Sequence, residues 1–103
     1  MENRPFAALG QPVSAVGIGT WQLGIDRDEI DPDDAAATLQ AAVETGVTLI
    51  DTADVYGDGR SERFVGHFLA TRPKAELVVA TKMGRRVPPT TANYSRDNFR
   101  LWN

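Results

Sequence analysis

Three residues that can cooperate in proton transfer lie near the ends of apolar runs in this chain. Asp51 follows the run 47–50, Tyr56 comes five residues later, and Lys82 follows the run 77–81. A tyrosine hydroxyl is a weak general acid at neutral pH because its ordinary pKa is about 10, and a nearby ammonium group lowers that value. A carboxylate beside the lysine keeps the ammonium charged and oriented. The three residues therefore predict donation of a proton to a carbonyl oxygen on which charge develops.

Each of these residues also has an ordinary structural explanation. An aspartate at a strand end can cap the following loop, a tyrosine in a glycine-rich loop can pack, and a lysine after a strand is usually solvated. For any one of the residues taken singly, the structural explanation is the commoner one. Their shared spacing along the chain favours a joint role.

This spacing connects the candidate residues to the elements that must position them. Thr20, Asp51 and Lys82 each end an apolar run, and equal steps of 31 residues separate them. A step of this length accommodates a strand, a helix and two loops, so successive strands are expected to run parallel with helical crossovers. Parallel strands of this kind end at one edge of the sheet, where α/β folds place their active sites. We expect all three side chains at that edge.

Three β-compatible runs supply the strands of this α/β chain. They cover residues 16–20, 47–50 and 77–82. The third run is almost unbroken in its hydrophobicity, which is typical of a parallel strand buried on both faces. Turn residues within the preceding segment 6–16 predict a small hairpin or an irregular lead-in.

Two helices are expected between these strands. The first has Asp31 as N-cap and Pro32 at its first position, and it ends before Gly46, which suits a left-handed cap. The second has Ser61 as N-cap and ends at Pro73. Apolar residues at three- and four-residue spacing are expected to face the core: Ala36, Leu39 and Val43 in the first helix with Val47 just after it, and Phe64, Val65, Phe68 and Leu69 in the second.

The glycines of the first strand permit two interpretations. Gly17 and Gly19 begin like a dinucleotide-binding fingerprint, but Gln22 occupies the third glycine position and no helix begins there. Close approach of a flat or bulky group to the strand end explains the glycines better, with Trp21 as a stacking surface. Simple packing of Trp21 is the alternative.

Three further residues give weaker signals. His67, the only histidine, lies more than a quarter-turn away from the apolar stripe of its helix, which predicts a solvated position. Arg85 and Arg86 can meet an anionic ligand, although a solvated pair is the commoner explanation.

Composition excludes several classes of protein. The 103 residues are 42% hydrophobic and 24% charged, as in one ordinary globular domain. A net charge of −3 lacks the basic surplus that nucleic-acid binding needs. We expect no metal site, because cysteine is absent, histidine occurs once, and the acidic segment 26–34 lacks the spacing of a calcium loop. With neither a secretory signal nor a membrane span visible, we expect a cytoplasmic protein.

Several motifs, in this order, resemble the aldo-keto reductase superfamily. They are Gly17-Ile18-Gly19-Thr20-Trp21, Asp51-Thr52-Ala53-Asp54-Val55-Tyr56-Gly57 followed by Ser61-Glu62 and Val65-Gly66, and Ala80-Thr81-Lys82. The resemblance covers essentially the whole chain. It implies an N-terminal hairpin plus the first three β/α units of a (β/α)8 TIM barrel, with residues 1–103 as the N-terminal part of a single domain. It also implies NADPH, bound in an extended conformation without a Rossmann domain, as hydride donor to a small aldehyde or ketone.

The resemblance assigns roles to individual residues. Tyr56 looks like the general acid, Lys82 like the cation that activates it, and Asp51 like the salt-bridge partner of that lysine. The family's fourth catalytic residue, a histidine after the fourth strand, has no counterpart, since His67 is on the wrong element. The residues that match cofactor contacts of the family are Gly19, Thr20, Trp21 and Asp51.

The chain resembles only the first part of such a barrel. Its last segment begins like a helix capped by Ser95 and stops within about two turns, without a glycine terminator. Because a barrel of this type needs about 250 residues, we expect a truncated, inactive fragment that self-associates through the open edge of its third strand. One alternative is a non-catalytic, nucleotide-binding barrel subunit of the same superfamily that regulates a membrane channel. Another is a natural short product that pairs its open edge with another fragment.

Overall fold

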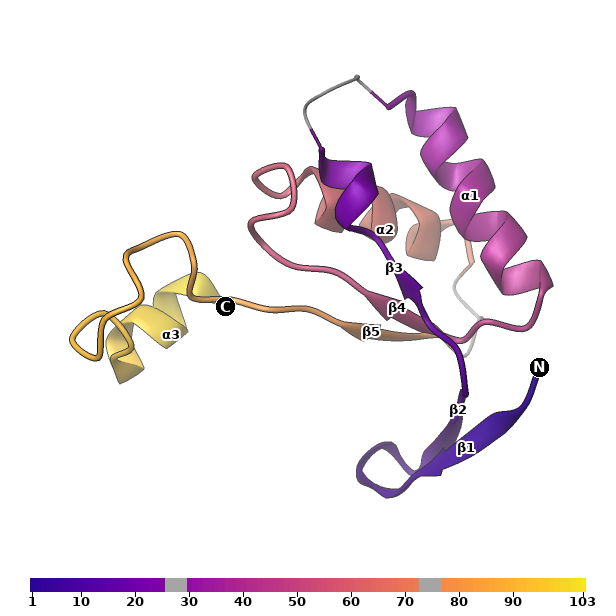
Figure 1. Ribbon diagram of the computed structural model, residues 1–103, viewed down its shortest axis with the longest axis horizontal. Helices are drawn as coiled ribbons and strands as arrows, with labels where there is room; N and C mark the ends of the chain where they lie inside the picture. Colours follow the sequence, from indigo (N-terminus) through magenta and orange to yellow (C-terminus); the bar gives the residue numbers. More distant parts are fainter. Residues whose placement is uncertain (26–29, 73–76) are drawn as a thin grey trace.

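The computed structural model of the chain describes residues 1–25, 30–72 and 77–103. Strands β1 and β2 form an antiparallel hairpin, and β3, β4 and β5 form a parallel sheet with β4 in the middle (Figure 1). The hairpin and the alternation of parallel strands with helices confirm the expected organisation, and the described residues form no closed barrel. The elements are β1 (Asn3–Phe6), the 3-10 helix η1 (Ala7–Leu9), β2 (Gln11–Ser14), β3 (Ile18–Gly19), the 3-10 helix η2 (Trp21–Gly24), α1 (Pro32–Glu44), β4 (Leu49–Asp51), α2 (Arg60–Ala70), β5 (Val78–Ala80) and α3 (Arg96–Trp102).

The ends of helix α1 follow their sequence signals. The Asp31 carboxylate accepts a hydrogen bond from the main-chain N–H of Asp33 at 2.7 Å, and Pro32 is the first helical residue. Gly46, just beyond the helix, has a φ of +95°, which is the left-handed conformation expected of it. In α3, Ser95 caps the helix by accepting from the N–H of Asn98, also as predicted.

Helix α2 begins differently from the prediction. Its N-cap is Gly59, whose φ is +88°, so the helix starts at Arg60 and Ser61 lies within its first turn. The prediction that Ser61 caps the helix is therefore wrong, because the left-handed glycine turns the chain into the helix two residues earlier. The predicted stop at Pro73 lies outside the described residues, as do Asp26, Asp28 and Glu29 of the acidic segment.

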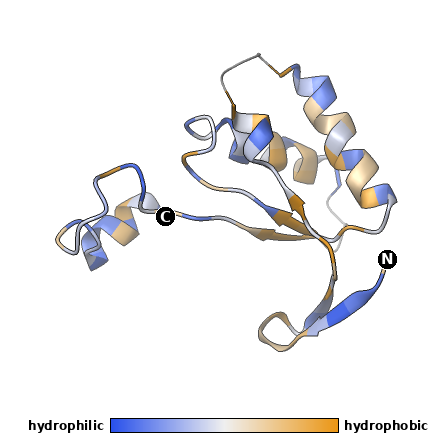
Figure 2. Ribbon diagram, in the orientation of Figure 1, coloured by the Kyte–Doolittle hydropathy of each residue, from blue (hydrophilic) through white to orange (hydrophobic). Residues whose placement is uncertain are grey.

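Both long helices cover one face of the parallel sheet (Figure 1). Figure 2 shows that hydrophobic residues run along β3 and β4, beneath these helices. In α1 the prediction of Ala36 as a core residue is wrong: Ala35 is buried and Ala36 is exposed, because Ala35 shares a face with Leu39 one turn later. The buried core residues are Leu23, Ala35, Leu39, Ile50, Val65 and Phe68, with Val43, Phe64 and Leu69 packed partly buried against them.

Strand β5 is not buried on both faces, contrary to the prediction. Val79 is 36% exposed and Ala80 is also exposed. The sheet ends at β5 within the described residues, and α3 lies in a separate lobe joined to the sheet by extended chain (Figure 1). The radius of gyration of 15.0 Å accordingly exceeds the ~13 Å of a compact 100-residue domain.

Candidate active site

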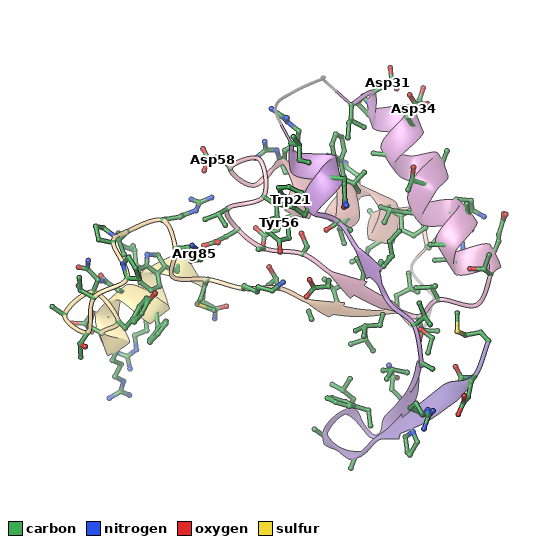
Figure 3. All side chains as sticks on the ribbon, viewed as in Figure 1. Trp21, Asp31, Asp34, Tyr56, Asp58 and Arg85 are labelled. Atoms are coloured by element: carbon green, nitrogen blue, oxygen red, sulfur yellow. The ribbon has the colours of Figure 1, made fainter. Side chains whose placement is uncertain are left out.

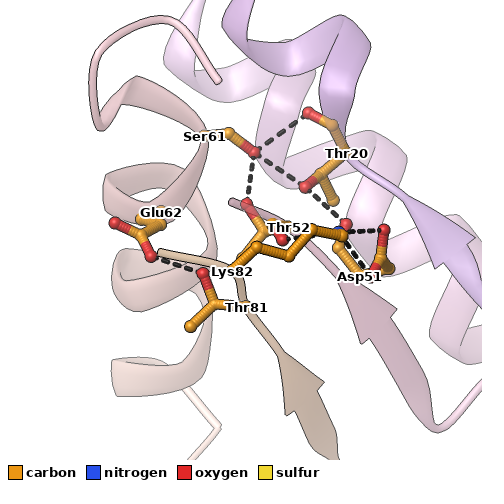
Figure 4. Close-up of polar contacts among 7 residues, drawn as sticks. All are labelled: Thr20, Asp51, Thr52, Ser61, Glu62, Thr81 and Lys82. Atoms are coloured by element: carbon orange, nitrogen blue, oxygen red, sulfur yellow. Dashed lines mark hydrogen bonds and ion pairs between the residues drawn. The ribbon is translucent and has the colours of Figure 1, made fainter. Parts of the chain in front are cut away.

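The three residues on the 31-residue spacing meet at the carboxyl edge of the sheet. Thr20 follows β3, Asp51 ends β4, and Lys82 lies two residues beyond β5. The main-chain N–H and the hydroxyl of Thr20 both donate to the main-chain oxygen of Asp51, at 3.0 and 2.9 Å. Lys82 Nζ donates to both carboxylate oxygens of Asp51 at 2.8 Å (Figure 4). The prediction that these residues share one edge is confirmed.

The ammonium group of Lys82 is held firmly but remains in contact with solvent. Besides the Asp51 carboxylate, it binds the main-chain oxygen of Thr52 at 3.0 Å. The side chains of Lys82 and Asp51 are 53% and 47% exposed. The hydrogen bond to Asp51 raises the pKa of Lys82 above its ordinary value of 10.5, and desolvation opposes this rise. Lys82 is therefore a protonated, oriented cation at neutral pH.

Tyr56 lies next to this cation. Lys82 Nζ is 5.3 Å from the centre of the Tyr56 ring. The tyrosine is partly buried, in the loop between β4 and α2. The structure thus gathers Asp51, Tyr56 and Lys82 within one site, although 26 residues separate the tyrosine from the lysine.

A close backbone contact fixes the loop that carries Tyr56. A Cβ on Gly24 would lie 2.3 Å from the carbonyl carbon of Tyr56, so only glycine lets η2 approach this closely. Gly57 on the other side of the contact has a φ of +63°. At the loop ends, Asp54 N–H donates to Lys82 O and Ser61 N–H donates to Tyr56 O, at 3.1 and 3.2 Å. Sequence reasoning missed Gly24, because a single glycine in a polar loop carries no signal of its contact partner.

A buried network of hydroxyl groups braces the strand ends beneath the site. Ser61 Oγ lies 2.7 Å from Thr20 Oγ1 and 2.9 Å from Thr52 Oγ1 (Figure 4). All three residues are at most 1% exposed. Since Thr20 also bonds the main-chain oxygen of Asp51, α2 is tied through Ser61 to both β3 and β4. The Ser61 hydroxyl thus bonds to this network and does not cap the helix, a role that no local sequence pattern indicates.

The residues matched to cofactor contacts leave an accessible surface beside the site, except Thr20, which is fully buried. Trp21 is 58% exposed, and Figure 3 shows it at the same end of the sheet as Tyr56. A Cβ on Gly19 would meet nothing within 4 Å, whereas one on Gly17 would lie 3.0 Å from Leu49 O. Gly17 therefore serves strand packing, while Gly19 and Trp21 leave room for a flat group near Asp51. The residues present fit a planar ring at this position.

The remaining candidate residues lie elsewhere or are already engaged. His67 is exposed on α2, as predicted, and lines a cavity of about 410 Å³ near α1 that contains none of the candidate site residues. Arg85 is exposed on the segment that leads to α3, whereas Arg86 pairs with Asp54 and Asp58.

The described residues form neither a metal-binding cluster nor a membrane-spanning helix. Across residues 1–25, 30–72 and 77–103, no cluster of three acidic or histidine side chains could hold a metal ion. None of the helices in this part of the chain is long and apolar enough to cross a membrane.

Sequence comparisons match nearly the whole chain to one protein family. The profile of the Aldo/keto reductase family matches residues 15–100. The D-threo-aldose 1-dehydrogenase of Pseudomonas sp. is 42% identical over 83 residues, which are 81% of this chain and 25% of the relative. The L-galactose dehydrogenase of Arabidopsis thaliana is 38% identical over 87 residues, 82% of this chain and 27% of the relative. The chain thus spans about a quarter of the length of these relatives.

Solved structures give the same match. The glycerol dehydrogenase of Gluconobacter oxydans superposes with a TM-score of 0.70 at 41% identity, over 80% of this chain and 25% of that protein. An aldo-keto reductase of Klebsiella pneumoniae, solved in complex with NADPH, superposes with a TM-score of 0.61 at 33% identity, over 70% of this chain and 24% of that protein.

Proposed function

Because this chain belongs to the aldo/keto reductase family, we propose that it supplies the proton-transfer residues of an NADPH-dependent enzyme that reduces an aldehyde or ketone to an alcohol. One observation carries the proposal: Lys82 binds the Asp51 carboxylate and lies 5.3 Å from the Tyr56 ring at the carboxyl edge of the sheet. Active sites of barrels built from β/α units lie at this edge.

The surface beside this site supports a nicotinamide cofactor. The Klebsiella relative was solved with NADPH, and in this chain Gly19 and Trp21 leave an accessible surface next to Asp51. We assign Gly19, Trp21 and Asp51 to the nicotinamide end of the cofactor, while Thr20, which is 0% exposed, supports Asp51 from beneath. When bound, the cofactor supplies the hydride for reduction of the carbonyl carbon.

The side chains of the site then carry out the proton transfer. Tyr56 donates its hydroxyl proton to the carbonyl oxygen, on which negative charge develops. The Lys82 ammonium stabilises the phenolate that remains, because an adjacent positive charge favours the ionised form. Asp51 keeps Lys82 protonated and oriented. The Pseudomonas and Arabidopsis relatives are named for the reverse reaction, the oxidation of an alcohol. In that direction the ionised Tyr56 accepts the proton of the alcohol.

We expect the catalytic unit to be larger than these 103 residues. A barrel of this family needs about 250 residues, and this chain spans about a quarter of its relatives. We therefore expect the 103 residues alone to show no turnover. Activity requires the other strands and loops of the barrel.

A chimeric barrel tests the proposed function. Residues 15–100 would replace the matching segment of the Gluconobacter glycerol dehydrogenase, and turnover would be followed by the carbonyl-dependent loss of NADPH absorbance. Tyr56→Phe should lower kcat by about 100-fold or more, because it removes the general acid, and it should leave NADPH binding unchanged. The matched control is Tyr94→Phe, at the only other tyrosine of the chain, which should have no effect.

Two results would count against the proposal. Unchanged turnover in the Tyr56→Phe chimera would remove Tyr56 from the chemistry. A parent chimera that binds NADPH but shows no carbonyl-dependent oxidation would favour a nucleotide-binding barrel without catalysis.

A further inference from the structure

Arg86 bridges both sides of the loop that carries Tyr56. Its Nε lies 3.7 Å from Asp54 Oδ2, and its Nη2 lies 3.4 Å from Asp58 Oδ1. Nη2 also donates to the main-chain oxygen of Asp54, at 3.5 Å. Asp54 precedes Tyr56 by two residues and Asp58 follows it by two. One guanidinium group thus spans the segment in which the proton donor lies.

The two carboxylates depend on Arg86 to different degrees. The side chain of Asp54 is only 14% exposed, whereas that of Asp58 is 94% exposed. A carboxylate largely removed from water needs a compensating partner. The structure places the Arg86 guanidinium at this carboxylate, with Nε 3.7 Å from Asp54 Oδ2. The contact with Asp54 is therefore the better shielded of the two, although its N–O distance is the longer.

The loop backbone also needs external support. Gly57, Asp58 and Gly59 all have positive φ, at +63°, +49° and +88°. Aspartate adopts this left-handed conformation more readily than most residues but less readily than glycine, so contacts around Asp58 help to hold it. The carboxylate of Asp58 contacts Arg86, and its main-chain oxygen accepts from Arg63 Nη1 at 3.5 Å.

We propose that Arg86 is a positioning residue that holds Tyr56 in place by bridging Asp54 and Asp58, an inference that rests on the proposed function of Tyr56. The segment after β5 then contacts this loop at two points. Lys82 holds its start through Asp51 and Thr52, and Arg86 holds the part around Tyr56. A displacement of the Tyr56 hydroxyl by about 1 Å can lower the reaction rate up to about 100-fold. Loss of the Arg86 ion pairs would permit such a displacement.

The alternative role of Arg86 is to bind an anionic group of the cofactor. Its guanidinium is already engaged by two carboxylates and one main-chain oxygen, so an added anion would compete with existing contacts. The two roles differ in kinetics. A positioning residue affects kcat, whereas an anion ligand affects the KM for NADPH.

Kinetics of the chimeric barrel separate these roles. We expect Arg86→Ala to lower kcat about 10-fold and to leave the KM for NADPH nearly unchanged. Arg86→Lys should recover only part of the lost kcat, because lysine keeps the positive charge but lacks the planar guanidinium that contacts two groups at once. Arg85→Ala, the matched control, should change neither value. In a Tyr56→Phe background, Arg86→Ala should have no further effect on kcat, because the residue acts through Tyr56.

Three kinetic results would contradict the positioning role of Arg86 or the proposed role of Tyr56. A raised KM with unchanged kcat would overturn the inference in favour of an anion ligand. An equal loss of kcat with and without Tyr56 would overturn it in favour of general structural support. If Tyr56→Phe itself leaves kcat unchanged, the proposed function fails, independently of Arg86.

Hydrogen exchange tests the bridge in the 103-residue chain without any turnover. The amides of Arg60 and Ser61 donate to Gly57 O and Tyr56 O, so their exchange rates report on the loop. We expect Arg86→Ala to speed the exchange of both amides about 10-fold. Arg85→Ala should not change these rates, and the exchange of the Gly46 amide should be the same in both variants. Equal rates in the parent chain and Arg86→Ala would overturn the inference, as would a parent loop that is already unprotected.

Discussion

At the residue scale, the Asp51–Lys82 pair links the charge of the site to pH. Lys82 donates to three oxygen atoms, two on the Asp51 carboxylate and one on the main chain of Thr52. These contacts favour the protonated amine, and the pKa of Lys82 rises above 10.5 through the hydrogen bond to Asp51. A raised pKa means that the stability contributed by the pair is fully present below pH 10.5 and is lost as the pH rises through the raised pKa. Neutral solutions therefore retain the whole contribution.

Asp51→Asn should lower the pKa of Lys82 toward its ordinary value, because the variant removes the carboxylate that favours the ammonium. NMR titration of labelled lysine side chains measures this directly, with Lys74, the only other lysine of the chain, as internal reference. Because the pair is about half exposed, we expect a loss of stability of at most about 1 kcal/mol at neutral pH. That loss should disappear at pH values above the pKa of Lys82 in the parent chain. An unchanged Lys82 titration would contradict the dominant role of Asp51.

At the scale of elements, the contact between η2 and the loop after β4 determines where Tyr56 lies. Gly24 ends η2, and its α-carbon faces the peptide between Tyr56 and Gly57. A side chain at Gly24 would have to displace backbone, which cannot rotate aside as a flexible side chain can. The short helix η2 therefore acts as a support for the tyrosine loop, and glycine is the residue that permits this approach.

Gly24→Ala should destabilise the chain by about 1–3 kcal/mol, because the new methyl group would lie 2.3 Å from the carbonyl carbon of Tyr56. Gly66→Ala is the matched control, since Gly66 is exposed within α2 and a Cβ there meets nothing within 4 Å. This control should stabilise the chain by up to about 1 kcal/mol through helix propensity. Urea unfolding curves of both variants measure the difference. Equal midpoints would show that η2 can shift without cost.

At the scale of the whole molecule, the sheet carries an incompletely covered edge. A groove of about 210 Å³ runs between α2 and β5, with Val65, Leu69 and Val79 among its lining residues. No strand follows β5 in the described part of the chain, and α3 lies in its own lobe, away from the groove (Figure 1). An apolar strand with unpaired main-chain groups is a template for pairing with another chain.

We expect the 103-residue chain to self-associate through this edge, which light scattering coupled to size-exclusion chromatography measures. Val79→Lys should shift the population toward monomer, because a charge on an edge strand opposes pairing. Leu101→Lys, at an 81% exposed position on α3, should leave the association unchanged. A monomeric parent chain with a sharp unfolding transition would contradict the expectation.

The features that the sequence determined by itself depend on near neighbours along the chain. Asp31 and Ser95 cap their helices because an N-cap acts on main-chain N–H groups two or three residues away. Gly46 ends the turn after α1 because its own φ is positive. The 31-residue spacing extended this local information to the site, because repeated β/α units bring Thr20, Asp51 and Lys82 to one edge.

The tertiary structure alone decided the features that depend on which distant segments meet. The hydroxyl of Ser61 reaches Thr20 and Thr52 instead of its own helix end, and Gly24 touches a backbone more than 30 residues away. From the sequence alone, Arg86 is expected to be a solvated loop residue. Only the fold places its guanidinium beside Asp54. Strand β5 has the composition of a buried strand, yet whether a strand is buried depends on the layers packed around it. Local propensity carries no information about these contacts, because their free energy arises only once the segments come together.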